Sequence, residues 1–280
     1  MDSLVFFSVL AAAAMHAGWN AVIKTGTDRF TTMTIMSAAS AAVCIILLPL
    51  AEWPSLTVWY WIAASTVLHT GYKLFLIKTY SLGDLVQVYP LARGTAPLIV
   101  AIISLLFLTG EVTSSLFAGI LVLVAGIWLM ALRGGHNLRR INRPAVLSAL
   151  GTSCFIAGYT LADGVGARQA ASAASFMIYL AILEGVAIGY VYLASRGISG
   201  LRAPGVPWKD GCIGGVLSLS AYWIVVWAMT QAPIAAVAAL RETSVLFAVA
   251  IATFVMKEKL TTWRVAAALL ITGGVGVLRL

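Results

Sequence analysis

Two arginines lie at matching places in a repeated apolar pattern. Residues 91–133 and 239–280 repeat each other, and the alignment places Arg93 on Arg241. Each arginine falls inside an apolar stretch, where a charged side chain costs about 3 kcal/mol or more in hydrocarbon. A guanidinium stays charged and offers a fork of donors that matches carboxylate or phosphate-like groups. The pair therefore predicts a site for an anionic or zwitterionic solute between the two spans.

The acidic residues allow two interpretations. Glu184 lies in the middle of an apolar segment, and such a carboxylate can bind a proton and couple transport to the proton gradient. It could equally be the counter-ion of Arg241, and in that case each arginine is paired within the protein, Arg241 with Glu184 or Asp163. Asp163 and Glu242 lie nearer the ends of their spans, so we expect them to be interfacial or paired.

Polar and aromatic residues inside the apolar stretches are further candidates for contact with a solute. His16 and Asn20 are four residues apart and share a helix face. His69 and Lys73 have the same spacing, although Lys73 could snorkel toward the membrane surface. Interhelical hydrogen bonds and interfacial aromatic belts are the alternatives for such residues. The predicted solute-binding residues are Arg93, Arg241, His16, Trp19, Asn20, Tyr72, Tyr89, Tyr159, Tyr222, Trp223 and Trp227.

The composition indicates which elements position these side chains. The chain has 280 residues, of which 61% are hydrophobic and 10% charged, and its mean hydropathy is +0.98. A soluble fold cannot hide that fraction of apolar residues, whereas about 20 apolar residues span a bilayer. The three cysteines lie within apolar stretches, so no disulfide framework is expected. Ten apolar windows recur, at 4–22, 31–51, 56–77, 85–109, 114–132, 144–164, 172–194, 210–229, 233–256 and 263–280.

Basic residues gather in alternate loops, which predicts the orientation of the chain. Lys and Arg are retained on the cytoplasmic side of short loops. The loops after odd-numbered windows contain Lys24, Arg29, Lys78, Arg133, Arg139, Arg140, Arg143, Arg196, Arg202, Lys209, Lys257, Lys259 and Arg264. The other side has only Arg168 and Arg279. Both termini are therefore expected on the non-cytoplasmic side, and the net charge of +8 reflects loop position rather than binding to nucleic acid.

The repeat unit contains five windows, and an odd unit must insert its second copy upside down. Residues 16–20 match residues 156–160, which extends the repeat to the start of each copy. We expect a first repeat at 1–132, a basic cytoplasmic linker at 133–143 and a second repeat at 144–280. The predicted fold is an all-α integral membrane protein, with ten transmembrane helices as two inverted five-helix repeats around a central cavity.

Prolines distinguish the two copies. Pro90 and Pro97 bracket Arg93 in the fourth window, and the ninth window has no proline at the matching positions. Proline removes a backbone donor and kinks a helix. The sequence therefore predicts the softer helix in the first half.

Residues 230–278 resemble the EamA domain of the drug/metabolite transporter superfamily. They combine a polar turn, an Ala-rich span, a short turn containing Glu and a Gly-rich last span, and residues 80–112 follow the same plan. The resemblance implies ten spans around a central cavity in the cell inner membrane. It also implies export of small organic metabolites, without a nucleotide-binding domain.

These observations predict a secondary-active transporter that moves a small amino-acid-like or organic-anion metabolite by alternating access. Its expected partners are the solute and the lipid bilayer, with no nucleic acid, cofactor or metal, and a homodimer stays open. The alternative is a proton-coupled exporter of organic cations or drugs that uses Glu184. A membrane-embedded enzyme would need clustered acid, base or metal ligands, but the three histidines, at 16, 69 and 136, are scattered. Rings of acidic residues typical of a channel are also absent from the sequence.

Overall fold

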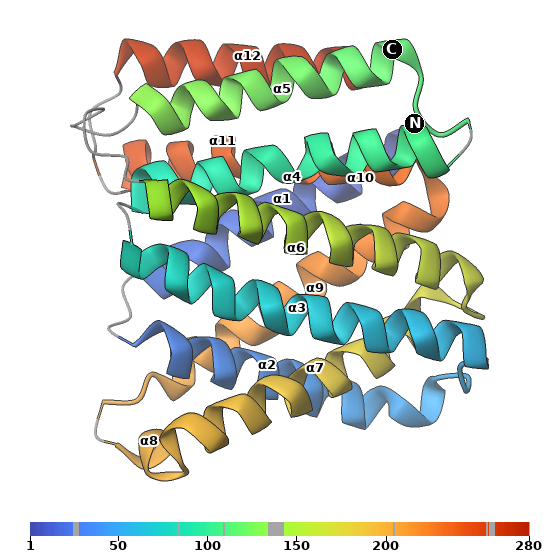
Figure 1. Ribbon diagram of the computed structural model, residues 1–280, viewed down its shortest axis with the longest axis vertical. Helices are drawn as coiled ribbons and strands as arrows, with labels where there is room; N and C mark the ends of the chain where they lie inside the picture. The colour runs from blue at the N-terminus through green and yellow to red at the C-terminus, as the bar shows by residue number, and fades with distance from the viewer. Residues whose placement is uncertain are drawn as a thin grey trace.

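The computed structural model is a bundle of helices that lie in layers, most of them roughly along one direction (Figure 1). The structure describes residues 1–24, 28–82, 85–108, 110–133, 143–203, 205–255, 257 and 261–279, and these ranges contain no strand. The first half of the chain forms α1 (Ser3–Lys24), α2 (Arg29–Leu47), a 3-10 turn (Leu48–Leu50), α3 (Leu56–Leu82), α4 (Leu85–Phe107) and α5 (Ser114–Arg133). The second half forms α6 (Arg143–Gln169), α7 (Ala173–Arg196), α8 (Ser199–Arg202), α9 (Trp208–Gln231), α10 (Ile234–Arg241), α11 (Ser244–Ala250), a π-helical turn (Ile251–Val255) and α12 (Thr262–Arg279).

Each of the ten apolar windows coincides with a helix, except that the ninth is divided between α10, α11 and the π-helical turn. Within the described residues, seven segments are long and apolar enough to cross a membrane. The prediction of an α-helical, multi-pass membrane protein is therefore confirmed. The number of spans and the repeat boundaries stay predictions, and most of the 133–143 linker lies outside the described residues.

The interruption of the ninth window lies beside the buried charges. α10 ends at Arg241 and α11 begins at Ser244. The backbone N–H of Thr243 donates to the Leu240 carbonyl and that of Val245 donates to the Glu242 carbonyl, each at 3.1 Å and each three residues back. These tighter bonds replace the regular α-helical pattern. α4 is one continuous helix through both of its prolines, and the interrupted helix belongs to the second half.

Ion pairs join helix ends at the periphery of the bundle. Arg168 pairs with Glu111, and its Nη2 also donates to the carbonyl of Ala232 at 2.9 Å. Arg196, at the end of α7, pairs with Asp28 at the start of α2. Burial alone would raise the pKa of Asp28, but hydrogen bonds from Thr31 and the charge of Arg196 lower it overall. Both pairs are partly exposed.

The two ends of the chain lie at the same end of the bundle (Figure 1). The Arg279 guanidinium donates to the Ser3 hydroxyl at 3.4 Å, so the last helix ends beside the start of the first. This arrangement agrees with an even number of membrane crossings.

Glycines allow α5 and α12 to pack with their backbones in close contact. A Cβ added at Gly274 would lie 2.7 Å from the Leu123 nitrogen and 2.9 Å from the Gly119 oxygen. Lipid tails are as apolar as leucine, so helices in a bilayer associate through close packing of small residues rather than through a hydrophobic driving force. Gly273, the next residue, has no atom within 4 Å of its added Cβ.

We expect Gly274→Ala to destabilise the protein by about 1–3 kcal/mol, because the methyl group meets backbone that has no room to move. Gly273→Ala is the matched control, and its effect should be small. Thermal unfolding of the two purified variants in detergent measures the difference. Equal melting temperatures would contradict the close packing of α5 against α12.

Candidate functional site

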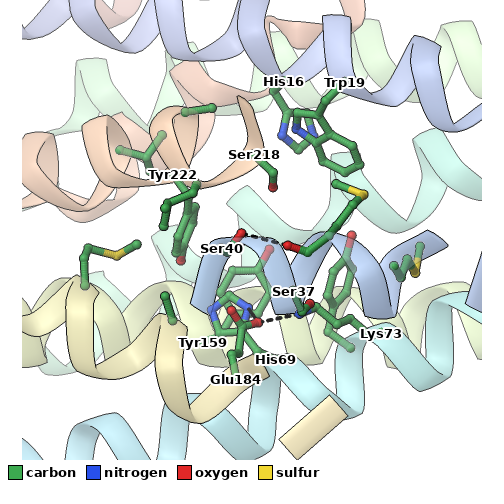
Figure 2. A pocket seen from close by; sticks show the side chains of 18 of the residues that line it. His16, Trp19, Ser37, Ser40, His69, Lys73, Tyr159, Glu184, Ser218 and Tyr222 are labelled. Carbon is green, nitrogen blue, oxygen red and sulfur yellow. Dashed lines mark hydrogen bonds and ion pairs between the residues drawn. The ribbon is translucent and has the colours of Figure 1, made fainter. Parts of the chain in front are cut away.

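A cavity of about 130 Å³ lies within the bundle and receives side chains from both halves of the chain. Its walls come from α1, α2, α3 and α4 of the first half and from α6, α7, α9 and α10 of the second. Figure 2 shows His16 and Trp19 projecting from α1 toward the wall that carries Tyr159 and Glu184. Eight of the predicted residues line it: His16, Trp19, Tyr72, Arg93, Tyr159, Glu184, Tyr222 and Arg241.

The first charged cluster in this wall contains both arginines. Arg93 binds Glu242 through two parallel hydrogen bonds, Nε to Oε2 and Nη2 to Oε1, each 2.8 Å long. Its Nη1 lies 2.6 Å from His16 Nε2. A guanidinium can only donate, so His16 accepts at Nε2 and carries its proton on Nδ1. Arg93 is therefore paired within the protein, which was one of the two alternatives for it. Its partner, Glu242, lies between α10 and α11.

Arg241 is less completely satisfied than Arg93. Its Nε lies 3.5 Å from Glu242 Oε1, and among the residues that the structure describes this buried nitrogen has no hydrogen-bond partner. The guanidinium carbon lies 5.9 Å from the centre of the Tyr159 ring. Neither Glu184 nor Asp163 pairs with Arg241, because both carboxylates lie in a second cluster. Among the residues that the structure describes, the two guanidinium groups thus share one carboxylate, which gives this cluster one positive charge in excess.

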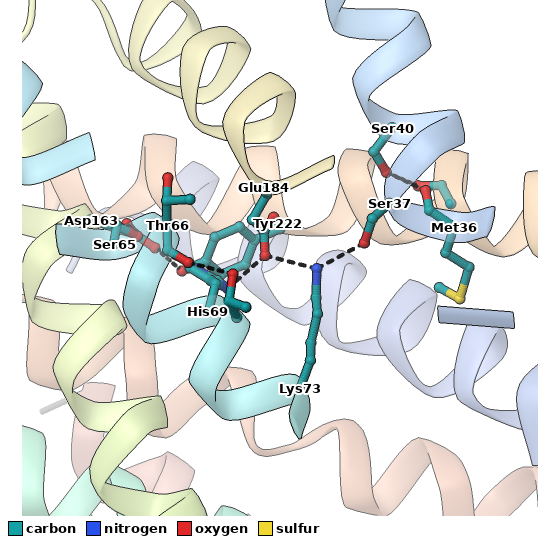
Figure 3. Close-up of polar contacts among 12 residues, drawn as sticks. Met36, Ser37, Ser40, Ser65, Thr66, His69, Lys73, Asp163, Glu184 and Tyr222 are labelled. Carbon is teal, nitrogen blue, oxygen red and sulfur yellow. Dashed lines mark hydrogen bonds and ion pairs between the residues drawn. The ribbon is translucent and has the colours of Figure 1, made fainter. Parts of the chain in front are cut away.

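The second cluster is centred on His69 (Figure 3). His69 Nε2 lies 3.0 Å from Asp163 Oδ2, and Nδ1 lies 3.1 Å from Glu184 Oε1. The ammonium group of Lys73 lies 2.9 Å from the same Glu184 oxygen and donates to Ser37 at 2.8 Å. Glu184 is therefore not an isolated carboxylate, and Lys73 reaches into the bundle instead of snorkelling to the surface.

Asp163 and Glu242 were both expected to be interfacial or paired, and their side chains are completely buried. Asp163 accepts hydrogen bonds from the hydroxyl groups of Ser65 and Tyr222. Both carboxylates are paired, as one of the two alternatives for them predicted.

Tyr159 lies between the two clusters. Its ring stacks on the His69 imidazole, with ring centres 3.9 Å apart and planes 21° apart, and its other neighbour is the Arg241 guanidinium. Tyr222 and Tyr72 approach it edge-on, at 6.1 and 5.6 Å between ring centres. The indole nitrogen of Trp19 has no hydrogen-bond partner among the described residues. The cavity therefore combines aromatic surface with unused polar donors.

Several predicted residues do not line the cavity. Asn20 donates to the His16 carbonyl of its own helix at 2.7 Å, and Trp223 and Trp227 pack against hydrophobic clusters of the bundle. Tyr89 lies outside the residues whose side chains are described. The cavity also includes His69 and Lys73, which their i, i+4 spacing had made candidates. Residues that line it and were not predicted include Met33, Met36, Ser37, Ser40 and Ser218.

No group of three or more His, Cys, Asp or Glu side chains within the described part of the chain could hold a metal ion. The contacts of both clusters are ion pairs and hydrogen bonds between protein groups. This geometry can bind a charged solute or a proton.

Comparisons with known proteins agree with this architecture. Residues 143–280 match the model of the EamA-like transporter family. A solved structure described as "Crystal structure of protein" superposes with a TM-score of 0.77 at 16% identity, over 99% of this chain and 97% of that chain, which indicates a shared fold. No curated protein sequence matches. The resemblance to EamA-type transporters of the drug/metabolite transporter superfamily is thereby confirmed, and through residues 143–280 this chain belongs to the EamA-like transporter family.

Proposed function

We propose that this protein is a secondary-active transporter that moves a small amino-acid-like or organic-anion metabolite by alternating access. The observation that carries the proposal is Arg241, a buried guanidinium at the wall of the cavity that shares Glu242 with Arg93. A buried donor without a partner costs about 1–3 kcal/mol. A carboxylate of the solute would accept from it and balance the excess charge.

The helix contacts support two inverted halves of five spans each. In such an arrangement α1, α2, α3, α4 and α5 are equivalent to α6, α7, α9, α10 with α11, and α12. The contact of α1 with α9 is then equivalent to that of α6 with α3, and the contact of α2 with α9 to that of α7 with α3. Likewise, α4 against α6 corresponds to the contacts of α10 and α11 with α1, and all of these contacts occur. The pairs α2–α7 and α5–α12 correspond to themselves and are also in contact. A pseudo-twofold axis in the membrane plane would produce this pattern.

The chemistry of the cavity favours an anion or a zwitterion over an organic cation. In the cation-exporter alternative, Glu184 must be available as the cation site. Lys73 and His69 already lie 2.9 and 3.1 Å from its carboxylate oxygen, so a cation would have to displace one of them. The Nε of Arg241 has no hydrogen-bond partner among the described residues, so an anion would not have to displace one there.

We also infer that both termini are on the non-cytoplasmic side of the inner membrane and that transport is outward. The orientation rests on the basic residues of the alternate loops, and the direction rests on the resemblance to metabolite exporters.

A ligand screen tests the proposed function. Thermal unfolding of the purified protein is measured with amino acids, organic anions and organic cations, and the stabilising compounds are then tested as substrates in proteoliposomes. We expect anionic or zwitterionic compounds to raise the melting temperature and to be transported. If organic cations alone stabilise the protein, and Glu184→Gln removes their effect, the alternative is correct and the proposed solute class is wrong.

A further inference from the structure

The imidazole of His69 lies between two carboxylates of the other half of the protein. His69 is on α3 in the first half, whereas Asp163 is on α6 and Glu184 on α7 in the second. One carboxylate oxygen lies within 3.1 Å of each ring nitrogen. A neutral imidazole has one donor and one acceptor nitrogen, so its acceptor would face an anionic oxygen. Only the doubly protonated ring presents a donor to both carboxylates.

The surrounding groups supply hydrogen bonds to Asp163 and a positive charge to Glu184. The hydroxyl groups of Ser65 and Tyr222 donate hydrogen bonds to Asp163, and the ammonium group of Lys73 lies against Glu184. The charged and titratable groups that face His69, from α3, α6, α7 and α9, are Lys73, Asp163, Tyr159, Glu184 and Tyr222. With His69 protonated, its charge and that of Lys73 balance the two carboxylates. Loss of its proton leaves one uncompensated buried negative charge, which is costly.

The two sides of the imidazole are not equivalent. The contact with Asp163 has hydrogen-bond geometry, and the Asp163 side chain has no exposed surface. The Glu184 side chain is 19% exposed and lines the cavity, and its Oε1 lacks a well-directed hydrogen bond among the described residues. A proton that moves between His69 and the cavity therefore passes through Nδ1, the ring nitrogen that faces Glu184.

We propose that His69 is the binding site for a proton that is coupled to transport. This inference rests on the proposed function, because alternating access moves one half against the other. Such motion lengthens the contacts of His69 with Asp163 and Glu184, and separation from both carboxylates removes the interaction that holds the proton. The proton then leaves Nδ1 for water in the cavity, Lys73 still compensates Glu184, and the hydroxyl groups of Ser65 and Tyr222 still solvate Asp163. Return of the halves restores the contacts and takes up one proton.

Selective labelling tests the protonation of His69 without any solute. The chain contains three histidines, so nitrogen-15 histidine gives few signals, which His16→Gln, His69→Gln and His136→Gln assign. We expect both ring nitrogens of His69 to be protonated at neutral pH, where an unperturbed histidine with a pKa of about 6.5 is mostly neutral. His16, which accepts from Arg93, should be a neutral ring. A neutral His69 at that pH would overturn the proposal even if the protein transports a solute.

Proteoliposomes test the coupling, with a radiolabelled amino-acid mixture as the probe. A pH gradient should drive accumulation by the wild-type protein and by the control His136→Gln. His69→Gln should lose gradient-driven accumulation but keep exchange of external for internal amino acids. Accumulation by His69→Gln equal to that of the wild type would disprove the coupling role. If the wild type exchanges no amino acid, the amino-acid part of the proposed solute class fails instead, and the labelling experiment still decides whether His69 holds the proton.

Discussion

Replacing Glu242 by alanine should destabilise the protein by about 3–5 kcal/mol, the cost of breaking a buried ion pair by removal of one partner. The carboxylate is completely buried, accepts two 2.8 Å hydrogen bonds from Arg93 and lies 3.5 Å from Arg241. Its loss removes the carboxylate that both buried guanidinium groups contact, and the two positive charges repel each other. The free energy of unfolding from denaturant titration in detergent micelles measures this loss.

The structure also predicts a rank order within this cluster. Arg93→Ala leaves Glu242 with Arg241 as a remaining partner, so it should cost less stability than Glu242→Ala. Arg196→Ala is the surface control: its side chain is 44% exposed, and such a pair contributes about 0–1 kcal/mol. The arrangement of one carboxylate between two guanidiniums would be wrong if Arg93→Ala were as damaging as Glu242→Ala, or more damaging.

The second large effect is expected at Arg241, on binding rather than on stability. Arg241→Ala should weaken binding of an anionic or zwitterionic solute by about 2–5 kcal/mol, which is at least about thirtyfold in affinity. The reason is that the solute carboxylate would be left buried without its charged donor. Glu242 keeps both hydrogen bonds to Arg93, so the variant should fold. Isothermal titration with the most stabilising compound of the ligand screen measures the change.

Two controls separate this effect from a general loss of structure. Arg241→Lys keeps the charge but lacks the planar fork of donors, so its affinity should fall between those of the wild type and the alanine variant. Arg196→Ala removes an exposed arginine that does not line the cavity and should bind like the wild type. Unchanged affinity in Arg241→Ala would make this arginine structural and would remove the main support for the proposed solute class.

The sequence alone predicted the class of protein and the position of Arg93 and Arg241 inside apolar helices. Apolar windows identify membrane helices because each residue adds its own free energy of transfer from water to the bilayer, and that contribution does not depend on residues far away in the sequence. The repeat identified Arg93 and Arg241 as equivalent positions, and the structure places both at one cavity. The i, i+4 pairs were informative for the same reason, since they depend on local helix geometry alone.

The partners of the charges were decided only by the tertiary structure. Arg241 was expected to pair with Glu184 or Asp163, whereas both carboxylates contact His69, and the counter-ion of both arginines is Glu242. The rotation and tilt of each helix, and the interruption after Arg241, determine which side chains are in contact. The hydropathy of the sequence gives no information about these three features. A buried charge also needs an opposite charge close enough to offset the free energy of its desolvation. The choice of partner is made in three dimensions, after the helices have packed.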